Sequence, residues 1–311
     1  MNTFKPGYLR LHRDGELTRR AELARKREQA CDLCARYCRV DRADRHGACR
    51  TGLKAWVASY GPHHGEEEPL RGWRGSGTIF FAWCNLRCQY CQNHDISQAA
   101  AGRELESEEI ASIMLNLQES GCHNINLVSP SHVVAEILEA LVIAVDHGLR
   151  LPLVYNTGGY DSPEALAMLD GVIDIYMPDM KYSDRLVART LSKIGGYPQV
   201  NQDAVREMHR QVGDLSLDSR GIAQRGLLVR HLVLPEGLAG TAEVVRFLAE
   251  EISPLTYLNL MDQYRPAFNA HNHPPLNRSL TSAEYGQALK MARDAGLTRL
   301  DKRLRGISLS W

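Results

Sequence analysis

The stretch that decides the fold of this chain is TIFFAWCNLRCQYCQN, residues 78–93. Its first six residues are mostly apolar, aromatic or β-branched, which is typical of a buried strand. Cys84, Cys88 and Cys91 follow at once, and no fourth cysteine joins them in the stretch. A strand that runs directly into reactive side chains is typical of parallel α/β folds, where the loops after the strands carry the chemistry.

The same pattern of a short apolar run followed by a helical pattern repeats along the chain. The predicted strands are residues 78–83, 124–130, 151–157, 172–178, 227–235 and 256–262. The predicted helices are residues 107–119, 132–146, 163–169, 202–212, 241–251 and 281–295. Apolar strands separated by helices imply right-handed crossovers and a parallel sheet buried on both faces. We therefore predict an α/β fold with a partial (β/α)6 TIM-like barrel, and a doubly wound open sheet is the alternative.

Polar side chains stand at or near the ends of several predicted strands. They are Ser129, Asn156, Asp179, Lys181, Arg230, His231, Gln263 and Tyr264. Because the carboxyl ends of parallel strands meet at one edge of the sheet, we expect these side chains to gather there. Gln263, Tyr264 and His231 are the candidates for catalysis, although the sequence assigns no residue a catalytic role.

The three cysteines of the opening stretch fit an iron–sulfur cluster better than a zinc ion. Four-iron clusters are normally held by four Cys thiolates, so a loop with three leaves one iron free to bind a small molecule. Structural zinc takes four protein ligands, and catalytic zinc with three protein ligands seldom draws them from one loop of thiolates. Cys84, Cys88 and Cys91 are therefore predicted to hold a 4Fe-4S cluster with one open iron.

The segment CNLRCQYCQN, residues 84–93, resembles the cluster motif of radical S-adenosylmethionine (SAM) enzymes, including the aromatic residue before its third cysteine, Tyr90. Within that superfamily the chain is most similar to the pyruvate formate-lyase-activating-enzyme branch and its uncharacterised relatives. The resemblance implies reductive cleavage of SAM to methionine and a 5′-deoxyadenosyl radical, which abstracts a hydrogen atom from the substrate. It also implies a protein or peptide substrate, with a glycyl radical as the product, and an electron donor of the flavodoxin or ferredoxin type.

Further residues are matched to the family one by one. Tyr90 and Asn93, which belong to the motif, are expected to bind the cofactor. Lys181 suits the SAM carboxylate and Asp179 a ribose hydroxyl or the ammonium group, with a surface ion pair as the alternative. The remaining candidates are Arg230 for a carboxylate, with a structural arginine as the alternative, and Asn156 for SAM, with a turn-forming asparagine as the alternative.

The end of the second predicted strand departs from the family pattern. Many superfamily members have a Gly-Gly-Glu type sequence there that binds the SAM amino group, whereas this chain has SPSH at residues 129–132. Ser129 and the neighbouring backbone are the candidates to replace it by hydrogen bonding. How the methionine part of SAM is bound is therefore open.

A second set of cysteines precedes the predicted barrel. Cys31, Cys34, Cys38 and Cys49 can close around a tetrahedral zinc or a complete 4Fe-4S cluster, and the spacing does not separate the two. Structural zinc is slightly favoured, because a small Cys-rich segment lacks apolar mass and a metal can supply its folding free energy. We predict a basic helical, metal-binding segment at residues 1–70 and the radical SAM barrel at residues 71–311.

Charge and hydropathy restrict the class of protein. Residues 1–54 hold 14 Lys and Arg against 7 Asp and Glu, although the whole chain has no net charge. A solvated helix at residues 16–30 explains this basic segment, so we do not expect a nucleic-acid partner. No apolar run is long enough for a membrane span, and the amino terminus is charged without a secretory apolar region, so a cytoplasmic enzyme is expected.

Two other functions stay open at this point. One is radical modification of a small molecule or a nucleic acid, which the basic segment mildly favours. The other is a non-catalytic iron–sulfur electron carrier. The polar rim of the predicted barrel argues against the carrier, because a carrier needs no pocket beside its cluster.

Overall fold

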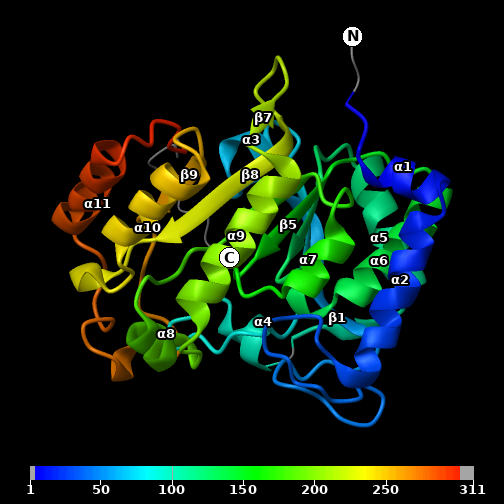
Figure 1. Ribbon diagram of the computed structural model, residues 1–311, viewed down its shortest axis with the longest axis horizontal. Coiled ribbons are helices and arrows are strands. Elements are labelled where there is room, and N and C mark those ends of the chain that lie inside the picture. Colours follow the sequence, from blue (N-terminus) through cyan, green and yellow to red (C-terminus); the bar gives the residue numbers. More distant parts are fainter. Residues whose placement is uncertain (1–3, 100, 302–311) are drawn as a thin grey trace.

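A computed structural model describes residues 4–99 and 101–301 (Figure 1). Its central sheet contains six parallel strands, and these are the strands predicted from the sequence. In sheet order they are β2 (Ser76–Phe81), β4 (Ile125–Val128), β5 (Leu153–Thr157), β6 (Ile175–Pro178), β8 (Ala223–Leu232) and β9 (Tyr257–Met261). The sheet does not close, so the predicted partial barrel is confirmed.

The predicted helices are confirmed as well, with small changes at their ends. They are α5 (Ser107–Glu119), α6 (Val134–Asp146), α7 (Pro163–Leu169), α9 (Tyr197–Val212), α10 (Thr241–Phe247) and α11 (Ser282–Asp294). Helix α10 continues as a π-helical segment, Leu248–Ile252. No helix in the described part of the chain has the length and apolar character needed to cross a membrane.

Helix caps account for two of these boundaries. Ser162 caps α7 as its position suggests, because its hydroxyl accepts a hydrogen bond from the Ala165 amide at 3.2 Å. Helix α5 is capped by Glu106, and Ser107 is its first helical residue. Glu106 and Glu109 form a reciprocal capping box there.

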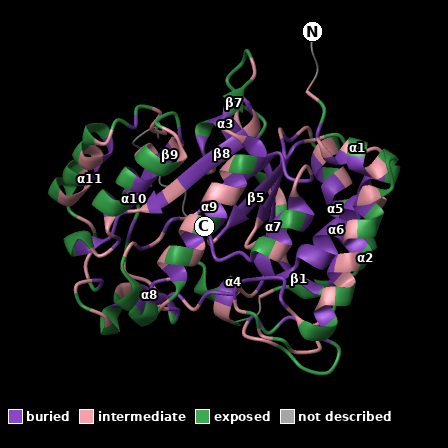
Figure 2. Cartoon of the chain, viewed as in Figure 1, coloured by how far each residue is buried: buried purple, intermediate pink, exposed green. Residues whose placement is uncertain are grey.

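Both faces of the parallel strands are covered, which explains their nearly continuous apolar sequences. Ile79, Leu127 and Leu153 are fully buried, and Figure 2 shows the strands as a buried layer beneath the helices. Strand register aligns the carboxyl ends. Thr157 lies opposite Pro178, and Asp179 pairs with Arg230 just beyond the end of β6.

Three strands extend the sheet in a way that the sequence analysis did not predict. Strand β1 (Ala55–His63) pairs antiparallel with β2, and β3 (Arg103–Leu105) pairs antiparallel with β1. The short β7 (Ser216–Leu217) pairs antiparallel with β8. Because β1 belongs to residues 1–70, this segment and the barrel share one sheet, and the boundary at residue 70 stays a prediction from sequence.

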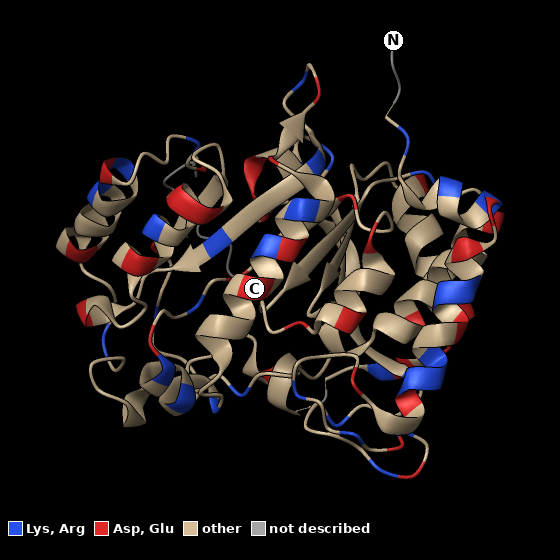
Figure 3. Ribbon diagram, viewed as in Figure 1, with Lys and Arg blue, Asp and Glu red and all other residues tan. Residues whose placement is uncertain are grey.

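The amino-terminal helices also share the main core. Helices α1 (Tyr8–Arg13) and α2 (Glu16–Arg27) lie beside α6 at the edge of the molecule (Figure 1). The buried face of α2 carries Leu17, Ala21 and Ala24. Its outer face carries charges of both signs, as Figure 3 shows, and Glu16 forms ion pairs with Arg19 and Arg20 at 2.7 Å each. The basic segment is therefore a packed amphipathic helix.

The remaining helices are short and connect the sheet to its loops. They are α3 (Glu68–Arg71), α4 (His94–Ala99) and α8 (Arg185–Ser192). Helix α4 follows the cysteine loop directly, and α8 follows β6. Both contact the loop of residues 84–93.

Candidate functional site

A cavity of about 160 Å³ lies at the carboxyl ends of the parallel strands. The residues singled out from the sequence that line it are Cys84, Cys88, Cys91, Asn93, Ser129, Asn156, Asp179, Lys181 and Arg230. They come from the ends of β2, β4, β5, β6 and β8 and from the loops that follow them. The aligned strand ends thus bring together in space residues that are up to 146 positions apart between Cys84 and Arg230.

The cysteine loop is fixed by backbone hydrogen bonds to two other segments. Trp83 turns the chain at the end of β2 with a positive φ of 65°, and its amide donates to the Ile96 carbonyl at 3.0 Å. The Gln89 amide donates to the Leu191 carbonyl of α8 at 2.7 Å. The loop is therefore held by the barrel rather than by its own few residues.

Each of the three thiols has a polar neighbour. Cys88 Sγ lies 3.0 Å from Ser192 Oγ, and Cys91 Sγ lies 3.1 Å from Ser97 Oγ. The Leu86 amide donates to Cys84 Sγ at 3.4 Å. Burial raises the pKa of Cys84 to about 12. A metal centre would favour the thiolate form, and these hydroxyl and amide groups can then donate to sulfur.

Sequence reasoning missed Ser97 and Ser192. Ser97 lies on α4, and a short polar helix directly after the last cysteine is the signal that could have pointed to it. Ser192 ends α8, 101 positions after Cys91, and no local pattern marks it. It reaches the site only because α8 packs on the cysteine loop.

Asp179 lies between two cations on the opposite wall of the cavity. Lys181 Nζ donates to Asp179 Oδ2 at 2.6 Å, and Arg230 Nε donates to Asp179 Oδ1 at 2.8 Å. Burial alone would raise the pKa of Asp179, but Arg230 and Lys181 together lower it to about 2. Glu66 and Glu67 also act on Arg230, but Lys181 and Arg230 still offer this wall two cationic groups for an anionic part of a ligand.

The end of β4 presents backbone rather than a carboxylate. Ser129 lines the cavity with a positive φ of 59°, and its amide donates to the Asn156 carbonyl at 2.9 Å. The Asn156 residue is buried, with 4% of its surface exposed. A side chain at Gly158 would come within 2.9 Å of Leu86, so the backbone there comes close to the cysteine loop.

The three candidates for catalysis lie outside the residues that line this cavity. Both ring nitrogens of His231 are engaged, Nδ1 with the Met180 carbonyl at 2.6 Å and Nε2 with Thr241 Oγ1 at 2.9 Å. The Tyr264 hydroxyl donates to the Leu276 carbonyl at 2.6 Å.

Tyr90 and Gln263 hold the outer side of the cysteine loop. The Tyr90 ring is buried and lies edge-on to the rings of Tyr182 and Tyr264, with centroids 6.3 Å and 5.9 Å away. Gln263 is exposed, and its carbonyl accepts a hydrogen bond from Gln92 Nε2 at 3.1 Å. In this arrangement Tyr90 packs behind the loop and does not line the cavity.

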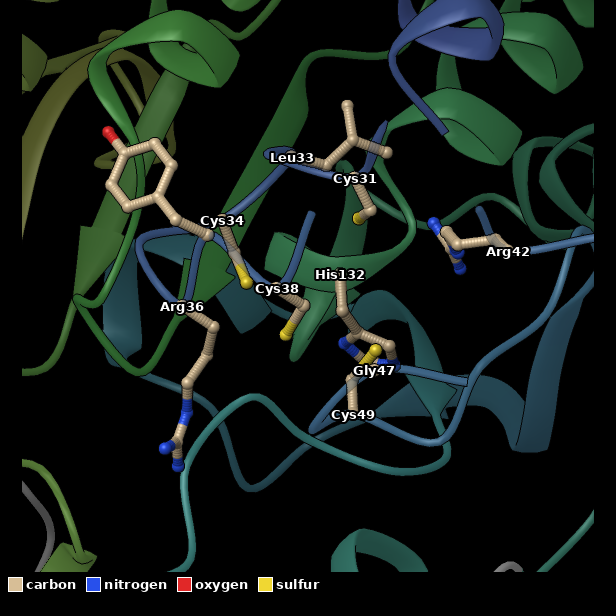
Figure 4. Close-up of a pocket in the computed structure, with 10 residues that line it drawn as sticks. Cys31, Leu33, Cys34, Arg36, Cys38, Arg42, Gly47, Cys49 and His132 are labelled. Carbon is tan, nitrogen blue, oxygen red and sulfur yellow. The ribbon is translucent and has the colours of Figure 1, made fainter. Parts of the chain in front are cut away.

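The second set of cysteines surrounds a smaller cavity, which His132 and Arg42 also line (Figure 4). Cys34 and Cys49 are buried, whereas Cys31 and Cys38 are partly exposed. Within residues 4–99 and 101–301, no three His, Cys, Asp or Glu side chains are arranged to hold a metal ion. This holds for both cysteine sets.

Two comparisons with known proteins bear on this site. The sequence model of the radical SAM superfamily matches residues 78–248, which is more than half of the chain. The chain is also similar to "Uncharacterized protein MJ0674" of Methanocaldococcus jannaschii, with 29% identity over 288 residues. That alignment covers 89% of this chain and 78% of the relative.

Proposed function

This chain belongs to the radical SAM superfamily, and from that premise we propose that it abstracts a hydrogen atom from a protein or peptide, as glycyl-radical-activating enzymes do. Membership of the superfamily implies an enzyme that uses an iron–sulfur cluster and SAM. The choice of a protein substrate is supported by the similarity of the Asp179 and Lys181 pair to the activating-enzyme branch, whereas residues 84–93 resemble the superfamily as a whole.

The donor set fits a 4Fe-4S cluster with one open iron. Cys84, Cys88 and Cys91 line one cavity, and Ser97 and Ser192 lie within hydrogen-bonding distance of two of their sulfur atoms. When bound, the cluster supplies the single electron that divides SAM into methionine and a 5′-deoxyadenosyl radical. The hydroxyl groups of the two serines would adjust its reduction potential by donating to sulfur.

The polar wall opposite the cysteines suits SAM. Lys181 and Arg230 can receive the SAM carboxylate while Asp179 keeps both cations in place. Asn156 and the Ser129 backbone stand at the neighbouring strand ends and offer hydrogen bonds to the amino group or the ribose. These side chains would orient SAM before it is cleaved, and orientation of this kind is a large part of enzymatic rate enhancement.

Apolar side chains complete the cavity. Phe80, Phe81 and Val128 line it together with the cysteines and the polar residues. Such walls keep water away from a reactive group and strengthen the electrostatic contacts inside. The chain's own residues thus bind, orient and shield, and the cofactors supply the redox chemistry.

The proposed cleavage of SAM rests on one observation. Three cysteines and the trio of Asp179, Lys181 and Arg230 line the same cavity. The test is anaerobic reconstitution with iron and sulfide, followed by incubation with SAM and dithionite. We expect 5′-deoxyadenosine and methionine from the wild type and neither from the C84A/C88A/C91A triple variant. Cys122→Ala, a buried cysteine outside both sets, is the matched control and should retain activity.

The protein substrate is tested separately. Candidate partner proteins are incubated with the reconstituted enzyme, SAM and reductant, and electron paramagnetic resonance is used to look for a glycine-centred radical. A glycine signal that depends on SAM supports the proposal. SAM cleavage without such a signal on any partner, but with a modified small molecule, would contradict the protein substrate and leave the SAM chemistry intact.

A further inference from the structure

We propose that Cys31, Cys34, Cys38 and Cys49 bind a second 4Fe-4S cluster, fully ligated by the protein and adjacent to the first cysteine loop. This proposal does not depend on the substrate proposed above. It concerns a site that the family match, which begins at residue 78, does not include.

The four cysteines line a common space. Figure 4 shows the side chains of Cys31, Cys34, Cys38 and Cys49 around this cavity, with the side chain of His132 among them. Three of them come from one tight loop, and Cys49 comes from a second segment 11 positions further along. Convergence of four thiols from two segments is unusual unless a metal centre joins them, and no disulfide links any of them.

The backbone of this loop is built to present the thiols. The Cys31 amide donates to the Val40 carbonyl at 2.8 Å, and the Arg39 amide donates to the Cys31 carbonyl at 2.9 Å. Tyr37 and Arg39 both have positive φ, at 46° and 53°, although neither is glycine. Strained residues of this kind gather at functional sites, because the surrounding structure must enforce them.

Cys38 lies against backbone, as a cluster ligand does. The Ala48 amide donates to Cys38 Sγ at 3.3 Å. A Cβ at Gly47 would lie 2.9 Å from Cys38 Sγ and 3.0 Å from its Cβ, so no larger residue fits there without moving the ligand. Amide donors to cysteine sulfur stabilise the negative charge of a cluster and raise its reduction potential.

The two cysteine sets are joined by Asn85, which is 2% exposed. Its side-chain oxygen lies 3.8 Å from Cys84 Sγ. Arg36, from the second cysteine loop, donates to the Asn85 carbonyl at 2.6 Å. One buried residue therefore contacts a thiol of the first set and the loop of the second set.

A second bridge is Arg87. Its guanidinium donates to the Ala48 carbonyl beside Cys49 and to Gln98 Oε1, the latter at 3.1 Å. A cation between two sets of thiolates offsets the negative charge that two neighbouring clusters would carry.

Zinc is the competing ligand, and two observations bear on the choice. The enclosed space is about 10 Å³, room for about one water molecule, which by itself admits a single ion. Four thiolates are the ligand set of a complete 4Fe-4S cluster as well as of structural zinc. The position of the set favours the cluster, because Arg36 of its loop donates to the Asn85 carbonyl at 2.6 Å and the set therefore adjoins the first cysteine loop, which lies inside the superfamily match.

A cluster with four protein ligands has no open iron for a substrate, so electron transfer is the chemistry that it can perform. An iron–sulfur or flavin donor protein would reduce this second cluster by transferring one electron to it. The same electron then passes to the cluster of the first set, with no atom transferred. The shared contacts through Asn85 and Arg87 make this path short.

The test is metal analysis of the full chain, reconstituted anaerobically with iron and sulfide in the presence of zinc as a competitor. We expect about eight irons and no zinc per chain in the wild type. The C84A/C88A/C91A variant should keep about four irons, and Mössbauer spectra should assign them to a 4Fe-4S cluster. The C31A/C34A/C38A/C49A variant should also keep about four, and Cys122→Ala should keep about eight.

About four irons together with one zinc per chain in the wild type would overturn the proposal, and so would loss of all iron from the C84A/C88A/C91A variant. That variant leaves the second set intact, so the test does not require that the quadruple variant folds. Electron paramagnetic resonance of the reduced wild type adds a second readout, in which two close clusters broaden each other's signal. Eight irons without SAM cleavage would instead contradict the proposed function and leave this inference standing.

Discussion

Lys181 Nζ lies 2.6 Å from Asp179 Oδ2, and this ion pair forms part of the cavity wall that faces the cysteine loop. Arg230 binds the other carboxylate oxygen, so the aspartate stands between two cations. The trio is mostly buried, with 14% of the Asp179 side chain exposed. Removal of the carboxylate would therefore leave two positive charges facing each other with little solvent between them.

Asp179→Asn tests this arrangement through stability. We expect the free energy of unfolding to fall by about 3 kcal/mol, because the uncompensated cations stay buried. Urea unfolding followed by circular dichroism measures the change. Asp203→Asn is the control, since its ion pair with Arg206 is on the surface and should contribute about 0.5 kcal/mol. Equal effects in the two variants would contradict the prediction.

Because His231 is buried, we predict that the stability of the protein depends on pH. Burial lowers its pKa from 6.5 to about 4. Because the folded pKa lies below the unfolded one, the stability contributed by this group is complete above pH 6.5 and is lost as the pH falls toward 4. The loss amounts to about 3 kcal/mol over this window.

The measurement is the free energy of unfolding between pH 4 and 8 for the wild type and for His231→Gln. The variant should be less stable at neutral pH but should lose less stability on acidification. His147→Gln, at an exposed position, should keep the pH slope of the wild type. An unchanged slope in His231→Gln would show that other groups account for it.

Ser192→Ala tests the hydroxyl beside Cys88. If Ser192 Oγ donates to the sulfur of a bound cluster, its removal makes that cluster harder to reduce, because one donor to the charged sulfur is lost. We expect the midpoint potential to become more negative by tens of millivolts in a redox titration followed by electron paramagnetic resonance. Ser112→Ala, on the outer face of α5, should leave the potential unchanged, and a shift of equal size there would refute the assignment.

Arg42 joins the amino-terminal segment to the barrel through a buried ion cluster. It contacts Glu28 at 3.0 Å and Glu136 of α6 at 3.2 Å, and the three side chains are 1–2% exposed. Arg42→Met should lower the free energy of unfolding by about 4 kcal/mol, because the buried Glu136 loses this ion pair and Glu28 keeps only its pair with Arg25 at 3.2 Å. Arg45→Met, at an exposed position in the same loop, should change it by about 0.5 kcal/mol or less.

The sequence placed residues near strand ends, but it did not show on which face of the sheet each side chain lies. Arg230 and His231 were both placed at the rim from sequence, but consecutive strand residues point to opposite faces. Arg230 reaches the cavity, and His231 packs outside it against Met180 and Thr241. Because side chains alternate between the two faces along a strand, this alternation would have placed Arg230 and His231 on different faces.

Contacts between residues far apart in the chain could not be predicted from the sequence, for a different reason. Ser192 has no local pattern that marks it as a neighbour of cysteine sulfur, and none marks Asn85 as a neighbour of Arg36 in the second cysteine loop. Strand β1 was missed because its sequence, AWVASYGPH, contains glycine and proline and has a largely exposed outer half. Its pairing with β2 stabilises it, and pairing of this kind depends on tertiary context.

The sequence by itself determined the alternation of six apolar strands with helices and the spacing of Cys84, Cys88 and Cys91, because local periodicity and ligand spacing are properties of neighbouring residues. Only the tertiary structure decided which distant side chains share a space. It brought Asp179, Lys181 and Arg230 to the same cavity as the first cysteines and placed Asn85 against Arg36 of the second cysteine loop, because strand register and helix packing fix contacts that no local pattern encodes.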